Sequence, residues 1–216
     1  MKRMTLNQLL DERIVAIIRG VTGDGFHHLI DTLVENSIRV MEVTVDTPGV
    51  YDKIAQIKAQ YGEDILIGAG TVLDSETARL AISAGAEFIV SPSLNLGVVQ
   101  TAKRYGKLAL PGCMTPTEVV QAYEAGADVI KVFPASVVGP RYIRELSGPL
   151  GHIPLLPTGG INLDNARDYL EAGAVAIGLG SSLVGRGGQG IDLAAVKEKA
   201  QAFREVVKDF FATERE

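Results

Sequence analysis

Short apolar runs alternate along the chain with longer stretches in which apolar residues recur at helical spacing. Four segments share one pattern, in which the end of a helix runs directly into an apolar strand: residues 35–44, 83–92, 124–133 and 171–180. In three of them a glycine stands where helices commonly close: Gly85, Gly126 and Gly173. The intervals between these glycines leave room for two β-α units of about 20–25 residues each.

The remaining strands are predicted at residues 14–18, 65–69, 108–111 and 153–157. Eight strands alternating with helices, and no second domain, predict one α/β domain over residues 1–216, a (β/α)8 TIM barrel. An extra helix precedes the first strand (Leu6–Glu12), and a long one, Asp192–Phe211, ends the chain. The alternative is a doubly wound open sheet, but neither a linker nor a Gly-x-Gly-x-x-Gly follows the first strand, which favours the barrel.

Polar residues before several helical stretches predict where those helices begin. Thr115, Pro116 and Glu118 have the spacing of a capping box with proline at the first helical position. Two other helices have alternative caps: Asp74 or Ser75, and Asn162 or Asp164.

Composition excludes several functions. Hydrophobic residues make up 46% of the chain, which is enough for a sizeable core, and the net charge of -5 argues against nucleic acid or an anionic membrane surface as partner. The polar amino terminus and the absence of an apolar run of membrane-spanning length predict a cytoplasmic protein that does not enter the membrane.

Cysteine and histidine give no sign of a metal site. Cys113 is the only cysteine, so neither a disulfide nor a cysteine metal site forms within the chain, and we interpret it as a small strand-end filler. His27, His28 and His152 lack the spacing of metal ligands. We therefore expect no metal and no cofactor.

Lys131 is a charged residue in the middle of an apolar run, residues 128–134. Such a run is typical of a buried parallel strand, where desolvating an ammonium group is costly. Burial favours the neutral amine, which can attack a carbonyl carbon to form a Schiff base. The alternative is a structural lysine whose ammonium reaches solvent or pairs with a carboxylate.

Glu42 is a second charge within an apolar strand. The strand period puts Glu42 on the same face as Val40, and Lys131 on the same face as Val129. If both faces point into the barrel, the two side chains meet near its top, where such barrels carry their chemistry. We expect the ammonium to lower the pKa of Glu42, and Glu42 to shuttle protons once Lys131 is an imine. The alternative is a structural pairing of Glu42 with Arg39 or Lys131.

Glycines follow the last two predicted strands. Gly159 and Gly160 come after the seventh strand, and Gly180 and Ser181 after the eighth, which is the usual phosphate position in this architecture. The alternative is that these glycines only make tight turns. The glycine-rich segment 185–190 is interpreted as a flexible connector, with Arg186 as a further candidate near the phosphate.

Taken together, these segments resemble the 2-keto-3-deoxy-6-phosphogluconate (KDPG) aldolases, also described as 2-keto-4-hydroxyglutarate (KHG) aldolases. The resemblance extends from Ile14 to about Val184 and rests on these segments: 16–20, 42–44, 68–72, 88–92, 111–118, 131–134, 157–160 and 178–181. It implies a metal-free class I aldolase with a (β/α)8 fold, usually a homotrimer. It also reaches the related aldolases that act on galactonate-derived substrates.

The resemblance implies a role for each matching residue. Lys131 corresponds to the Schiff-base lysine and Glu42 to the proton-transferring carboxylate. The wall of the pyruvate pocket corresponds to Thr71, Pro92 and Phe133, and the phosphate-binding residues to Gly159, Gly160, Gly180 and Ser181. Many members carry an arginine for the pyruvate carboxylate four residues after the glutamate, where this chain has Asp46. Arg19 matches an arginine of other members and is the candidate for that role.

The predicted reaction is cleavage of KDPG, of 4-hydroxy-2-oxoglutarate, or of both, to pyruvate and an aldehyde through a Schiff base. The partners are then a small 2-keto acid phosphate and pyruvate. Three alternatives remain: an aldolase for 2-keto-3-deoxy-6-phosphogalactonate, a phosphate-binding isomerase or synthase without a Schiff base, and a non-catalytic binder that keeps the pocket.

Overall fold

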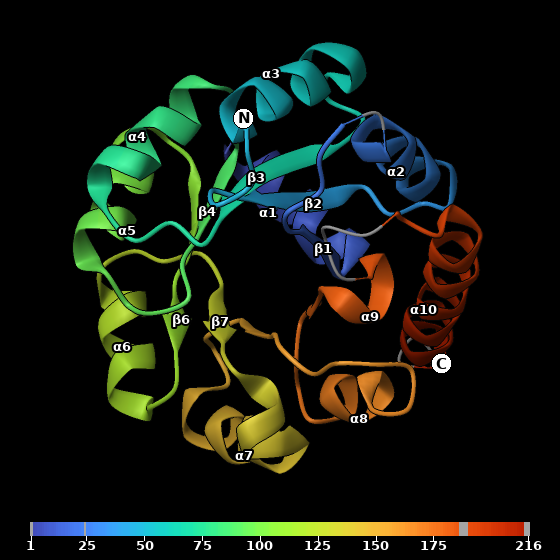
Figure 1. Cartoon of the computed structure of the whole chain (residues 1–216). Helices are drawn as coiled ribbons and strands as arrows, with labels where there is room; N and C mark the ends of the chain where they lie inside the picture. The colour runs from blue at the N-terminus through green and yellow to red at the C-terminus, as the bar shows by residue number, and fades with distance from the viewer. Residues whose placement is uncertain (1, 24, 186–189, 214–216) are drawn as a thin grey trace.

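A computed structural model describes residues 2–23, 25–185 and 190–213. Its strands are β1 (Ile14–Ile18), β2 (Val40–Thr44), β3 (Leu66–Gly70), β4 (Phe88–Val90), β5 (Leu108–Leu110), β6 (Gly112–Cys113), β7 (Ile130–Val132), β8 (Leu155–Pro157) and β9 (Ile177–Leu179). Its helices are α1 (Lys2–Glu12), α2 (Gly25–Glu35), α3 (Val50–Tyr61), α4 (Ser75–Ser83), α5 (Leu96–Arg104), α6 (Pro116–Glu124), α7 (Ala135–Leu150), α8 (Ala166–Glu171), α9 (Ser181–Val184) and α10 (Leu193–Thr213). Figure 1 shows most of the helices in a ring around the strands. The predicted alternation of strands and helices is thus confirmed.

All strand pairs are parallel, and the strands form two curled sheets. The larger sheet has the order β5-β4-β3-β2-β1-β9, and the smaller has the order β6-β7-β8. The strand predicted at 108–111 ends at Leu110, because Pro111 has no N–H for a sheet hydrogen bond, and the separate strand β6 follows it. Hydrogen bonding nonetheless links the two sheets at both of their edges. On the β5 side, Asp128 N donates to Ala109 O over 3.0 Å, and on the β9 side a parallel bridge joins Thr158 to Gly178.

Two apolar clusters lie on the two sides of the curled sheet. The larger cluster packs the outer face of the strands against the surrounding helices and includes Phe26 of α2 and Phe203 of α10. The smaller cluster fills the concave side with alternate residues of the strands, among them Val40 of β2 and Val129 of β7. Leu9 of α1 belongs to this inner cluster, so the extra helix covers the amino ends of the strands.

The predicted helix caps are confirmed at two of three places. Thr115 and Glu118 form the capping box of α6, and the Asp74 carboxylate caps α4. The third prediction is wrong, because Asn165 is the N-cap residue of α8. The amide oxygen of Asn162 instead accepts the backbone N–H groups of Asp164 and Asn165, and so holds the turn before the helix.

Element ends differ from the predictions by a few residues. The first helix begins at Lys2, the last spans Leu193–Thr213, and the strand predicted at 153–157 begins at Leu155. Within the described part of the chain, every helix is too short or too polar to cross a membrane.

Candidate active site

One cavity of about 580 Å³ lies at the carboxyl ends of the strands. Its lining includes every substrate-binding and catalytic residue predicted from the sequence: Arg19, Glu42, Thr71, Pro92, Lys131, Phe133, Gly159, Gly160, Gly180 and Ser181. These residues follow or belong to strands of both sheets. The fold therefore brings together in one place residues that are more than 150 positions apart in the chain.

Lys131 lies in the middle of β7, two residues beyond Val129 of the inner cluster. Its exposed fraction is only 6%, so its ammonium does not reach out into solvent. The nitrogen lies 5.1 Å from the centre of the Phe133 ring, and among the described residues it has no partner in a hydrogen bond or ion pair. Lys131 thus lines the cavity together with Glu42, whose carboxyl feels its charge.

Glu42 lies on β2, two residues beyond Val40, and is 2% exposed. Burial raises the pKa of its carboxyl above the ordinary value, although the charges of Lys131 and Arg19 act in the opposite direction. The ammonium of Lys131 does act to lower this pKa, as expected, but the expected net lowering is wrong, because desolvation outweighs the attraction. A buried carboxyl with a raised pKa is suited to accept and return a proton.

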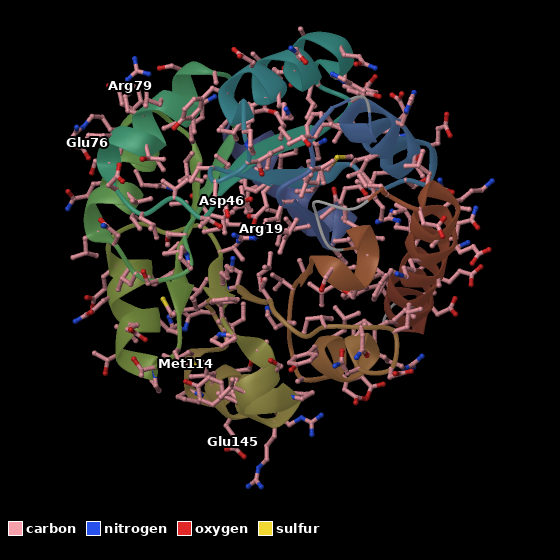
Figure 2. The ribbon with its side chains drawn as sticks, viewed as in Figure 1. Arg19, Asp46, Glu76, Arg79, Met114 and Glu145 are labelled. Atoms are coloured by element: carbon pink, nitrogen blue, oxygen red, sulfur yellow. The ribbon has the colours of Figure 1, made fainter. Side chains whose placement is uncertain are left out.

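Arg19 follows β1 and is held by two partners at the rim of the cavity. Its Nη1 donates to Asp46 Oδ2 over 2.7 Å, and its Nη2 donates to Thr71 Oγ1 over 2.8 Å. Figure 2 shows Arg19 and Asp46 side by side above the middle of the ring of strands. Burial would raise the pKa of Asp46, but a hydrogen bond with Thr44 and the charge of Arg19 hold that pKa below its ordinary value.

Gly159 and Gly160 bring the loop after β8 against Phe133, which follows β7, and against Ser136 in the first turn of α7. Both have positive φ angles, 92° and 77°, a region that favours glycine. A Cβ on Gly160 would lie 2.4 Å from the Cβ of Ser136, and one on Gly159 would lie 3.2 Å from the Phe133 ring. These glycines therefore allow a close contact between the loop after β8 and the start of α7, in addition to making a turn.

Sequence reasoning missed six residues that also line the cavity: Ile17, Thr158, Ile161, Asn162, Gly178 and Ser182. Thr158 is 3% exposed and lies between Pro157 and Gly159, within a segment that the sequence had already indicated. Ile17 precedes Arg19 by two positions, so the strand period offered a signal for it as well. Arg186, the further phosphate candidate, lies outside the described residues.

Cys113 is buried and is not among the residues that line the cavity. Burial, together with the charge of Glu118, raises the pKa of its thiol to about 12, so the thiol stays protonated. Within the described residues, no three His, Cys, Asp or Glu side chains come together as ligands for a metal ion.

Comparison with known proteins gives consistent matches. Residues 6–198 match the family model described as KDPG and KHG aldolase. The chain is 35% identical to the 2-dehydro-3-deoxy-6-phosphogalactonate aldolase of Escherichia coli (strain K12), over 90% of this chain and 96% of the relative. It is 37% identical to the 2-dehydro-3-deoxy-phosphogluconate aldolase of Haemophilus influenzae, over 76% and 78% of the two chains. A solved structure described as native KDPGal superposes with a TM-score of 0.87 at 34% identity, covering 92% of this chain and 96% of that one.

Proposed function

The chain belongs to the KDPG and KHG aldolase family, and we propose that it cleaves a 2-keto-3-deoxy-6-phospho sugar acid to pyruvate and glyceraldehyde 3-phosphate through a Schiff base on Lys131. The observation that carries the proposal is the state of Lys131, which is buried, unpaired among the described residues and in one cavity with Glu42. An amine at this place can attack the carbonyl carbon of a ligand bound in the same cavity.

The reaction follows from these two groups. The Lys131 amine attacks the C2 ketone, and loss of water gives an iminium ion. Glu42 takes the proton of the C4 hydroxyl, the C3–C4 bond breaks, and its electron pair moves into the iminium to leave an enamine. The C4 end departs as the aldehyde. Glu42 then returns the proton to C3, and water releases pyruvate and the free amine.

Arg19 and Thr71 are the proposed partners of the substrate carboxylate, which is attached to the carbon that becomes the imine. Arginine presents a planar set of donors that fits a carboxylate. Phe133 and Pro92 supply apolar walls beside Lys131, which keep water away from the imine.

The phosphate is proposed to bind where the loops after β8 and β9 meet, at Gly159, Gly160, Gly180 and Ser181. The support is that all four line the same cavity as Lys131, and that glycine lets backbone N–H groups approach an anion closely. A phosphate at this end directs C2 of a six-carbon chain toward Lys131.

Two sugar configurations fit the products, since gluconate-derived and galactonate-derived substrates give the same pyruvate and triose phosphate. Relatives of both kinds match this chain at similar identity. A third substrate, 4-hydroxy-2-oxoglutarate, would give glyoxylate and would leave the phosphate loops unused.

The test is a steady-state comparison of pyruvate release from these three substrates, with wild-type protein and with Lys131→Met. The proposal predicts that a phosphorylated substrate has the highest kcat/KM and that Lys131→Met abolishes release. Activity that survives Lys131→Met would instead favour a phosphate-binding enzyme without a Schiff base. Pyruvate binding without cleavage of any substrate would favour a non-catalytic binder.

We also infer that the two sheets close into one eight-stranded barrel, the single domain predicted from the sequence. Support comes from the bond between Asp128 N and Ala109 O and from the Thr158–Gly178 bridge, which span both boundaries. A cytoplasmic homotrimer remains the expectation from the family resemblance, and light scattering of the purified protein measures the number of subunits.

A further inference from the structure

Arg19 is a long, half-exposed side chain placed where a carboxylate is proposed to bind. Its exposed fraction is 55%, so packing alone does not fix its direction. Immobilising a side chain of this kind when a ligand binds costs conformational entropy, which weakens binding. The contacts that hold Arg19 in the unliganded protein therefore matter for affinity.

Asp46 is itself held by a set of buried hydroxyl groups. Thr44 and Thr47 are 0% and 2% exposed, and their hydroxyl oxygens lie 3.3 Å apart. Thr44 also hydrogen-bonds to Asp46, while Thr47 Oγ1 accepts the backbone N–H of Gly20 over 3.0 Å. Gly20 follows Arg19 directly in the chain. The hydroxyl groups that contact Asp46 are therefore also bonded to the backbone next to Arg19, whose guanidinium Asp46 binds.

Arg19 and Thr71 keep donors to spare. An arginine side chain has five N–H donors, and two of them are used by Asp46 and Thr71. The Thr71 hydroxyl accepts from Arg19, so its own proton is available for donation. Both side chains line the cavity with Lys131. They can therefore offer a substrate carboxylate a pair of donors whose positions are set before it arrives.

We infer that Asp46 is a positioning residue, which holds the Arg19 guanidinium in the direction that receives the carboxylate of a 2-keto acid. The inference rests on the proposed function, because it needs the keto group at Lys131. Asp46 acts only through Arg19. An acidic residue at the rim thus contributes to binding an anion, by ordering a cation in advance.

The test measures the rate at which borohydride traps Lys131 as a function of the concentration of the carbonyl compound. Two compounds are compared: pyruvate, and methyl pyruvate, which keeps the ketone and lacks the carboxylate charge. The variants are Asp46→Ala, Asp46→Asn, Arg19→Met and the double variant of Arg19→Met with Asp46→Ala. Glu171→Ala is the matched control, because Arg167 and Glu171 form an ion pair of 2.8 Å with similar exposure on α8.

The inference predicts that Arg19→Met raises the half-saturating pyruvate concentration by about 10- to 100-fold, as for loss of a charged hydrogen bond. Asp46→Ala raises it by about two- to fivefold, as for an exposed ion pair. Asp46→Asn, which keeps a hydrogen-bond acceptor, falls between wild type and Asp46→Ala. The double variant matches Arg19→Met within about twofold, because Asp46 has no separate contact to lose. Methyl pyruvate and Glu171→Ala show no change.

Three results would overturn the inference. The first is tighter or unchanged pyruvate binding in Asp46→Ala. The second is an equal loss with pyruvate and methyl pyruvate, which would point to a general structural effect. The third is a double variant clearly worse than Arg19→Met. If wild-type protein is trapped with pyruvate, these results bear on Asp46 alone; if it is not trapped, the Schiff-base proposal fails and the inference fails with it.

Discussion

The carboxylate of Glu42 lies directly over the backbone of Gly70 on the neighbouring strand. A Cβ added to Gly70 would lie 2.5 Å from Glu42 Oε1 and 2.6 Å from its carboxyl carbon. No real Cβ tolerates such distances, so any larger residue at position 70 displaces the carboxylate. The missing side chain of Gly70 is thus a condition for the position of the proposed proton carrier.

Gly70→Ala is expected to lower kcat by about 100-fold, since a shift of about 1 Å in a catalytic group has an effect of that size. Stability changes little, because the displaced carboxylate can move into the open cavity. Measured kcat near the wild-type value in Gly70→Ala would show that Glu42 does not need this position.

Gly68→Ala serves as the contrast, two positions earlier on β3. A Cβ there would lie 2.5 Å from the ring of Phe88, which is 0% exposed and cannot move into a cavity. We expect this variant to lose about 1–3 kcal/mol of unfolding free energy, as for overpacking of a core, and to keep most of its kcat when folded. The two neighbouring glycines therefore separate an effect on activity from one on stability.

Glu42→Gln is expected to be more stable than wild type at neutral pH. Burial raises the folded-state pKa of Glu42, so the folded protein binds this proton more tightly than the unfolded chain does. Stability then falls as the pH rises from the ordinary glutamate pKa of about 4.3 through the raised value. Glutamine does not ionise and avoids this loss.

Melting temperatures of both proteins across that pH range check the sign. The two curves should coincide in acid and separate as pH rises, with Glu42→Gln above. If wild type instead becomes more stable than Glu42→Gln as the pH rises, the folded protein favours the ionised carboxylate. That result would contradict the claim that burial raises the pKa of Glu42. Glu42→Gln should also lose activity, by about 100-fold or more, as for removal of a general base.

Gly160→Ala is expected to weaken binding of phosphorylated substrates selectively. The added methyl group would meet Ser136 at 2.4 Å, so the loop after β8 must move. We expect KM for a phosphorylated substrate to rise by about tenfold or more, as for a lost charged hydrogen bond, with little change for 4-hydroxy-2-oxoglutarate.

Gly139→Ala is the control for Gly160→Ala, because Gly139 has a similar φ of 73° and nothing within 4 Å of its added Cβ. Equal effects on both substrates would argue against a phosphate at Gly160.

Thr115→Ala tests the capping box of α6. Its hydroxyl accepts the Glu118 N–H, and the Glu118 carboxylate accepts the backbone N–H of Thr115 over 2.8 Å. Removing the cap is expected to cost about 1 kcal/mol of unfolding free energy, measured in urea, without change in kcat. Thr117 lies on the same helix, and its hydroxyl makes no hydrogen bond to the described residues. Thr117→Ala should therefore cost much less unfolding free energy than Thr115→Ala. Equal losses in the two variants would mean that helix propensity, and not the cap, causes the loss.

The strand period predicted which strand face carries Lys131 and which carries Glu42, and the structure shows that both faces point inward. Each stands two positions beyond a valine that belongs to the inner cluster, Val129 and Val40, and this relation can be read along one strand. The helix starts at Asp74 and Thr115 were predictable for the same reason, since a cap depends on residues within one turn.

Relations between distant segments were not predictable in this way. The pairing of Arg19 with Asp46 joins the ends of two strands, and only the folded chain sets which side chains meet there. The direction of the Glu42 pKa depends on the balance between desolvation and two nearby cations, and burial depth decides that balance. The short strand β6 beyond Pro111 was not predicted, although the proline was a local signal that the predicted strand 108–111 would end there.

Trapping with borohydride tests the central claim most directly. Wild-type protein is incubated with pyruvate, reduced with borohydride, digested and analysed by peptide mass spectrometry, with Lys131→Met and a sample without pyruvate as controls. The account predicts one modified peptide, carrying the reduced pyruvate imine on Lys131, and no modification in either control. A protein that remains unmodified, or that is modified at another lysine, would contradict it.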